Sequence, residues 1–160
     1  MKGSVKVIEA LNEVLMAEIM AINQYFIHAK MCENWGYLLL YEDTEKRAME
    51  EMTHAEKLIE RVLYLEGIPV ITKVDKINVG TTVKDQAEND HGLEKAAIQK
   101  LNRAIKLCYD ESDGGSRELL EHILLDEEKH ANDLESYLQM IKDMGIENFL
   151  VTQVHKKEKS

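Results

Sequence analysis

Residues 50–58 read EEMTHAEKL, and residues 127–134 read EEKHANDL. Both stretches contain the pattern Glu-x-x-His-Ala-x-x-Leu, whose histidine is His54 in the first stretch and His130 in the second. The two histidines are 76 positions apart. A pattern of this length, written twice at a wide separation, predicts that the chain is built from two related halves.

The same separation relates the glutamates of the two halves. Two pairs of glutamates stand 76 positions apart, Glu18 with Glu94 and Glu51 with Glu127. Each half therefore contains one segment with a single glutamate, followed by a segment with Glu-x-x-His. We expect an approximate twofold axis to relate the halves and to bring the repeated residues together.

Around these motifs the sequence predicts long amphipathic helices. Apolar and small residues recur at spacings of four and three, which is typical of a helix with one buried face. Breaks that contain glycine or proline separate the periodic segments. The predicted helices are 4–34, 37–66, 83–111, 115–144 and a short fifth helix at 146–155. The remaining stretch, KKEKS, predicts a frayed tail.

The lengths of the connections predict how the helices are arranged. The first and third connections are short, so the helices that they join are antiparallel. The middle connection, about 68–82, can extend over ~50 Å, whereas a helix of about 28 residues spans ~42 Å. It can therefore cross the whole bundle and leave the second and third helices parallel. We expect an all-α protein, one domain over 1–160, with the one-crossover four-helix bundle of the ferritin-like class.

The composition narrows the possible functions. Hydrophobic residues make up 44% and charged residues 31% of the chain, as in soluble globular proteins. The net charge of −10 argues against nucleic-acid binding, which needs clusters of Lys and Arg. We find no apolar run typical of a secretory signal or a membrane span, so we expect a cytoplasmic protein.

The repeated glutamates fall on the apolar stripe of their helices. Buried carboxylates repel one another, and an unpaired one costs several kcal/mol. Two imidazoles are too weakly basic to compensate four carboxylates, whereas two divalent metal ions balance them. Glu-x-x-His also places a carboxylate and an imidazole one turn apart, so both can bind one ion. The predicted metal ligands, a set typical of di-iron and di-manganese bundles, are Glu18, Glu51, His54, Glu94, Glu127 and His130.

Oxygen donors with one imidazole per ion suit Fe(II), Mn(II) or Zn(II), and a redox function needs iron or manganese. We expect Glu51 and Glu127 to bridge the two ions. Glu18 and Glu94 then serve as terminal ligands. A solvated acidic stripe is the alternative, but it does not explain why the whole set is repeated.

Further residues near the stripe are candidates for supporting roles. The outer ring nitrogens of the two histidines need acceptors, for which we consider Asp90 and Asp126. Tyr25 either donates a hydrogen bond or an electron to the site, or only packs in the core. His91 is interpreted as a hydrogen-bonded neighbour of the site rather than as an extra ligand.

Several stretches of the sequence resemble one protein family over essentially the whole chain. They read MKGSVKVIEALNEVLMAEIMAINQYF, NWG, HAEKLIERVLYLEGIP, LNRAI and DEEKH. In these stretches the chain is similar to the bacterioferritins, the haem-containing ferritins of bacteria. The resemblance implies a hollow cage of two dozen subunits that stores ferric mineral. It also implies a ferroxidase centre of two iron ions at the six ligands above, which oxidises Fe(II) with O2 or H2O2.

The resemblance further implies a b-type haem shared between two subunits and ligated by Met52 of each. A ferredoxin would pass electrons through this haem to release stored iron as Fe(II). Met52 belongs to a second, largely apolar stripe, which we expect to be buried against another subunit. The stripe consists of Ile19, Asn23, Phe26, Met49, Met52, Ile59 and Leu63.

The chain also departs from the family pattern. Lys46 and Glu50 stand where some members carry a His and an Asp on the cage wall, which puts an iron site on that wall in doubt.

Two other functions stay open at this level. One is a di-metal peroxidase or catalase that stores nothing, and the other is a non-catalytic cage that binds haem or metal. A rubrerythrin-type peroxidase would also need a site of four cysteines, and the chain has only Cys32 and Cys108. The preferred oxidant, and whether the ions stay bound or pass through, are not decided by the sequence.

Overall fold

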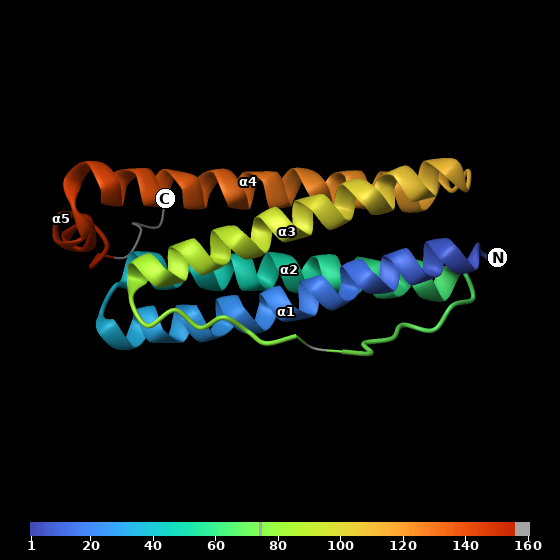
Figure 1. The fold of residues 1–160 in the computed structure, drawn as a ribbon. Helices are drawn as coiled ribbons and strands as arrows, with labels where there is room; N and C mark the ends of the chain where they lie inside the picture. Colours follow the sequence, from blue (N-terminus) through green and yellow to red (C-terminus); the bar gives the residue numbers. More distant parts are fainter. Residues whose placement is uncertain (74, 156–160) are drawn as a thin grey trace.

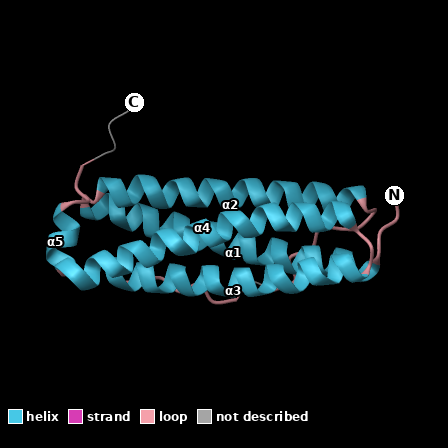
Figure 2. Ribbon diagram, turned by 90° about the horizontal axis from the view of Figure 1, so that it is seen from above, coloured by secondary structure: helices cyan, strands magenta, loops and turns pink. Residues whose placement is uncertain are grey.

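The computed structural model describes residues 1–73 and 75–155, and their regular structure is entirely helical (Figures 1 and 2). The helices are α1 Val5–Trp35, α2 Leu38–Tyr64, α3 Val83–Asp110, α4 Gly114–Met144 and α5 Ile146–Val151. The first four pack side by side as an elongated bundle, and α5 lies across one end (Figure 1). The predicted all-α four-helix bundle is confirmed.

The long middle connection runs back along the bundle. It leaves the end of α2, follows the side of the bundle and enters α3 at the opposite end, so α2 and α3 are parallel (Figure 1). As a result α1 and α3 run antiparallel and pack together, and α2 and α4 form the corresponding pair. This topology places the two halves of the sequence on opposite sides of a shared centre.

The ends of the helices have local causes. The Thr82 side chain accepts a hydrogen bond from the Asp85 N–H (3.1 Å) at the start of α3, and Asp113 accepts one from the Ser116 N–H (2.9 Å) at the start of α4. Gly36 ends α1 with a φ of 87°, which a glycine adopts without steric cost. The four long helices begin and end within two residues of the predicted bounds.

The predicted extent of the fifth helix is wrong. Helix α5 ends at Val151 rather than at 155. The chain turns there because the Gln153 carbonyl accepts a hydrogen bond from the Leu39 N–H (3.0 Å) at the start of α2, and the Gln153 side chain is buried. The predicted frayed tail lies outside the described residues.

The apolar core is divided into clusters along the bundle. One cluster includes Leu15, Leu58 and Leu120, and another near α5 includes Leu40 and Phe149. The repeated glutamates lie between these clusters along each helix. Apolar burial on both sides therefore fixes the four helices where the polar residues meet.

Both cysteines are buried and free. Cys32 belongs to the cluster near α5 and Cys108 to the cluster at the far end of the bundle. Among the described residues, no helix is long and apolar enough to cross a lipid bilayer.

Candidate metal centre

The structure brings the six predicted metal ligands together midway along the bundle. Each long helix contributes at least one of them, and every one of the six is 3% exposed or less. Their donor atoms form two groups in which all atoms lie within 4.8 Å of one another. The two groups are Glu18, Glu51, His54 and Glu127, and Glu51, Glu94, Glu127 and His130.

Two residues belong to both groups. Glu51 on α2 and Glu127 on α4 are each shared, whereas Glu18 and Glu94 each belong to only one group. A carboxylate has two oxygens and can therefore face two ions at once. This arrangement has the form of a two-ion site with two bridging carboxylates.

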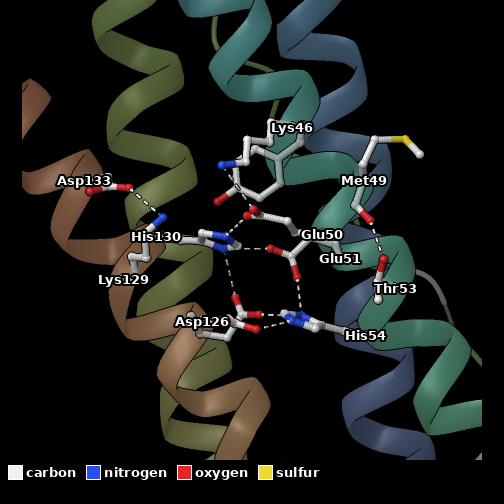
Figure 3. Close-up of polar contacts among 12 residues, drawn as sticks. Lys46, Met49, Glu50, Glu51, Thr53, His54, Asp126, Lys129, His130 and Asp133 are labelled. Atoms are coloured by element: carbon white, nitrogen blue, oxygen red, sulfur yellow. Dashed lines mark hydrogen bonds and ion pairs between the residues drawn. The ribbon is translucent and has the colours of Figure 1, made fainter. Parts of the chain in front are cut away.

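Both imidazoles direct Nδ1 toward the centre. The Nδ1 atom of His54 lies 3.0 Å from a Glu127 oxygen and 3.1 Å from a Glu51 oxygen, and Nδ1 of His130 lies 3.0 Å from the other Glu51 oxygen. The Nε2 atoms point away from the centre and contact other carboxylates (Figure 3). Each ring can therefore bind a cation through Nδ1, while its Nε2–H donates a hydrogen bond to a carboxylate on the side away from the centre.

The centre contains buried polar atoms that have no hydrogen-bond partner. They are Glu51 Oε1, Glu94 Oε2, Glu127 Oε1 and His130 Nδ1. The short contacts between some of these atoms lack hydrogen-bond geometry. Unsatisfied buried polar atoms are costly and rare in proteins. Their gathering in the two groups of candidate ligands fits a site that holds cations.

The carboxylates strongly affect the two imidazoles. Burial on its own lowers the pKa of His130, but contacts with Glu127 and Glu51 outweigh it and raise the pKa to about 12. The pKa of His54 is also raised, because contacts with Glu127 and Glu18 outweigh burial. Without metal, both rings therefore carry a proton on the nitrogen that faces the centre.

The carboxyl groups of the centre respond in different ways. Burial raises the pKa of Glu18 well above its usual value, and it raises the pKa of Glu94 to about 8 although His130 opposes it. Contacts with His130 and His54 outweigh burial at Glu51 and lower its pKa to about 2. In the metal-free protein, protons on Glu18, Glu94 and the two histidines therefore offset part of the negative charge that metal ions would otherwise balance.

One of the two predicted acceptors behind the histidines is correct. Asp126 accepts a hydrogen bond from Nε2–H of His54 at 3.0 Å, as expected. The prediction for Asp90 is wrong, since its carboxylate accepts from the Gln24 side chain (2.8 Å) and from Nδ1–H of His28 (2.9 Å). Asp90 is therefore tied to α1 and does not reach the histidines of the centre.

The residue behind His130 is Glu50, whose position the family resemblance places on the cage wall. Its carboxylate accepts a hydrogen bond from Nε2–H of His130 at 2.7 Å (Figure 3). Lys46 contacts Glu50 at 3.6 Å from the preceding turn. Glu50 and Asp126 are themselves 76 positions apart, so the repeat offset contained the signal that identifies Glu50.

Tyr25 supports the centre directly. Its side chain is fully buried, and its hydroxyl donates a hydrogen bond to Glu94. Burial, together with the charge of Glu94, raises the pKa of Tyr25 well above its usual value. His91 contacts Glu135 at 2.9 Å and belongs to neither group of donors, in agreement with its interpretation as a neighbour.

Much of the second apolar stripe is exposed on the surface of the chain, whereas its members Ile19 and Ile59 are half-buried and pack against the core. Met52 is 49% exposed, Phe26 52%, Met49 55% and Leu63 57%. Exposed side chains of this size in one stripe are typical of a surface that binds another protein. Met52 lies next to the candidate ligand Glu51 in sequence but points to solvent instead of to the centre.

Comparison with known proteins agrees with the geometry. The family model described as Ferritin-like domain matches residues 8–144. The chain is 40% identical over 147 residues to the Bacterioferritin of Mycolicibacterium paratuberculosis, an alignment that covers 92% of each protein. The chain belongs to the bacterioferritin family. It is also similar to the Bacterial ferritin of Pseudomonas aeruginosa, at 43% identity over 155 residues, 96% of this chain and all of that protein. The Bacterial ferritin of Synechocystis sp. is 40% identical over 155 residues, which cover 96% of this chain and 99% of that protein.

Proposed function

We propose that this bacterioferritin-family chain is a ferroxidase: it binds iron at the candidate centre, oxidises Fe(II) to Fe(III) and stores the product as ferric mineral. The observation that carries the proposal is the pair of buried donor groups that share Glu51 and Glu127. Family membership supports iron as the metal. Oxygen donors with one imidazole per ion suit Fe(II) as well.

Each candidate ligand has a defined task in this proposal. Glu51 and Glu127, which belong to both donor groups, would hold two ions together, and Glu18 and Glu94 would each hold one of them. Four carboxylates then balance the four positive charges of two divalent ions. Two Fe(II) ions held there would supply two electrons to an oxidant, either O2 or H2O2.

The surrounding groups of the chain prepare the site for these ions. Nδ1 of each histidine loses its proton when a cation binds, while Asp126 and Glu50 keep the rings in place. The Tyr25 hydroxyl fixes the orientation of Glu94. Burial of all six ligands keeps bulk water out, which strengthens every electrostatic interaction inside.

Storage also requires a container and a way to recover the iron. The exposed apolar stripe around Met52 supports self-association of the chain. We propose that dimers formed through this surface build a cage of two dozen subunits.

Two Met52 side chains, one from each subunit, would ligate a b-type haem, since the exposed thioether lies on a surface of matching apolar character. The haem supplies one-electron transfer, and a ferredoxin is the proposed donor for the release of Fe(II).

Aerobic addition of excess Fe(II) to the purified protein tests the ferroxidase proposal. We expect rapid oxidation and a ferric core inside assembled particles, measured by absorbance and by electron microscopy. Peroxide consumption without a core would instead favour a peroxidase or catalase. Oxidation no faster than in buffer would favour a non-catalytic cage.

A further inference from the structure

A groove of about 400 Å³ lies between α1 and α3. Small and apolar residues make up much of its lining, among them Met16, Ala17 and Met20 on α1, and Gly92, Leu93 and Ala97 on α3. Met16 and Gly92 are 76 positions apart, as are Ala17 and Leu93. The groove therefore lies where the two repeated halves cross.

The lining of this groove is close to the candidate metal centre. Ala17 and Leu93 directly precede the candidate ligands Glu18 and Glu94. Leu93 packs against a cluster that contains Tyr25, and the Tyr25 hydroxyl donates a hydrogen bond to Glu94. Contacts from Leu93 through the cluster that contains Tyr25 thus connect the groove to the candidate ligand Glu94.

The two faces of the centre differ in chemistry. The charged groups that line the α1/α3 groove are the acids Asp75 and Glu88 and the bases Lys76 and Lys100, whose charges cancel. On the α2/α4 face, a polar groove of about 260 Å³ includes His130 and the carboxylate of Glu50 that contacts it (Figure 3). The charges of this groove also cancel, since its lining contains the acids Asp43, Glu50 and Asp133 and the bases Lys46, Arg47 and Lys129. On the α2/α4 face a cation can nevertheless meet the Glu50 carboxylate, which contacts the candidate ligand His130. The surface of the α1/α3 groove is instead mainly apolar.

The wall of the α1/α3 groove is fixed by hydrogen bonds from the crossover. The Asn78 N–H donates to the Gln24 side chain (3.3 Å), and the Gly80 N–H donates to Nε2 of His28 (2.9 Å). The Asn89 side chain donates to the Asn78 carbonyl (3.2 Å). The crossover is thereby tied to both α1 and α3, so the groove is already formed in the folded chain.

We propose that the α1/α3 groove admits uncharged dioxygen to the centre, while Fe(II) arrives from the polar α2/α4 face. This inference rests on the proposed ferroxidase function. An apolar path suits dioxygen because the molecule carries no charge and gains nothing from polar groups, whereas a divalent cation would lose its hydration there without compensation. Separate paths keep the two reactants apart until both reach the buried ligands.

Gly92→Met tests the path with little risk to the fold. A Cβ atom at Gly92 meets no atom within 4 Å, and the repeat already places Met16 at the matching position of α1. The longer side chain should fill part of the groove. We expect the O2 concentration that gives half-maximal oxidation to rise several-fold, while Co(II) titration of the metal-free protein is unchanged. Gly92→Ala is the matched control, because its methyl group does not reach across the groove.

A second readout does not depend on activity. Crystals of the metal-free parent protein under xenon pressure should show xenon beside Leu93, and Gly92→Met should remove it. If Gly92→Met and Gly92→Ala have the same O2 dependence and the parent groove holds no xenon, the path is wrong although the ferroxidase proposal stands. A parent protein that does not oxidise Fe(II) would overturn both proposals.

Discussion

Glu50 on α2 and His130 on α4 are joined by a hydrogen bond of 2.7 Å between Oε2 and Nε2. Asp126 and His54 make the matching contact at 3.0 Å on the other side of the centre. The carboxylates are 76 positions apart, like the histidines, so the twofold relationship extends beyond the candidate ligands. Each carboxylate holds its ring with Nδ1 toward the centre, where a cation would bind.

Glu50→Ala should weaken metal binding at the His130 side by about 10–100-fold, the usual effect of losing the group that orients a histidine ligand. Glu50→Gln keeps an acceptor for Nε2–H and should lose less. Co(II) titration of metal-free protein, followed by visible absorption, measures the affinity. Glu60→Ala is the control, because Glu60 is an exposed residue of the same helix. Equal affinities for Glu50→Ala and Glu60→Ala would show that Glu50 does not orient the ring.

Glu18→Ala and Glu127→Ala should each abolish rapid Fe(II) oxidation while leaving the assembled protein intact. The first removes a terminal ligand and the second a bridging one, and neither removes apolar packing. Each change also removes a buried carboxylate that contacts His54, so metal-free stability should fall by about 3–5 kcal/mol, the usual cost of removing one partner of a buried ion pair. Stopped-flow absorbance, thermal unfolding and particle size check these outcomes. Oxidation at the parent rate in either variant would contradict the ligand assignment.

The arrangement of the long helices could be predicted because it depends on periodicity and connection length. The prediction of a parallel α2 and α3 required only that the crossover be long enough to span the bundle, and it did not depend on which residues the crossover contains. The end of α5 could not be predicted in this way. It depends on the hydrogen bond between Gln153 and Leu39, which are distant in sequence. Tertiary contacts of this kind override local helix propensity.

The candidate ligands could be predicted because the repeat places them in matching positions on buried stripes. Asp90 was predicted wrongly, since spacing along a helix does not show which neighbouring helix a side chain meets. Its partners Gln24 and His28 lie on α1. Glu50 was missed for the same reason, although its offset from Asp126 was visible in the sequence. The exposure of Met52 indicates a surface for association but does not by itself indicate haem.

Tyr25→Phe should keep the packing of the core but remove the donor to Glu94. A buried acceptor without its donor costs about 1–3 kcal/mol, so we expect a lower melting temperature and slower Fe(II) oxidation. Tyr137→Phe is a matched control, because it also removes one phenolic donor, to Asp43 at 2.6 Å, but outside the centre. Both variants should lose stability, and only Tyr25→Phe should oxidise iron more slowly. A parent-like rate for Tyr25→Phe would leave Tyr25 with a packing role alone.

Met52→Leu should remove haem from the protein without slowing Fe(II) oxidation. The substitution keeps an apolar side chain of similar volume, so the association surface should survive with a change below about 1.5 kcal/mol. Met49→Leu is the control, since Met49 is similarly exposed on the same helix. The haem content is read from the Soret absorbance per subunit, and the assembly from particle size. Haem retained by Met52→Leu, or lost equally by Met49→Leu, would contradict the axial role of Met52.

The metal-free protein should become less stable as the pH rises from 5 to 8. The folded-state pKa of Glu94 is about 8 and that of His130 about 12, and the pKa values of Glu18 and His54 are raised as well. The folded state therefore keeps protons that the unfolded chain releases. The unfolded chain loses the glutamate protons as the pH rises above the ordinary carboxyl pKa, and the histidine protons as it rises above the ordinary imidazole pKa. Each such proton lowers the free energy of unfolding by about 1.4 kcal/mol per pH unit over that range.

The lowered pKa of Glu51, about 2, acts in the opposite direction but only at lower pH, so it does not change the sign between pH 5 and 8. Because divalent ions displace the same protons, metal binding should release protons and become tighter as the pH rises. Thermal unfolding with and without Co(II), together with titration calorimetry in buffers of different ionisation enthalpy, measures both effects. Metal-free stability that rises over this pH range, or metal binding without proton release, would contradict the protonation states inferred for the centre.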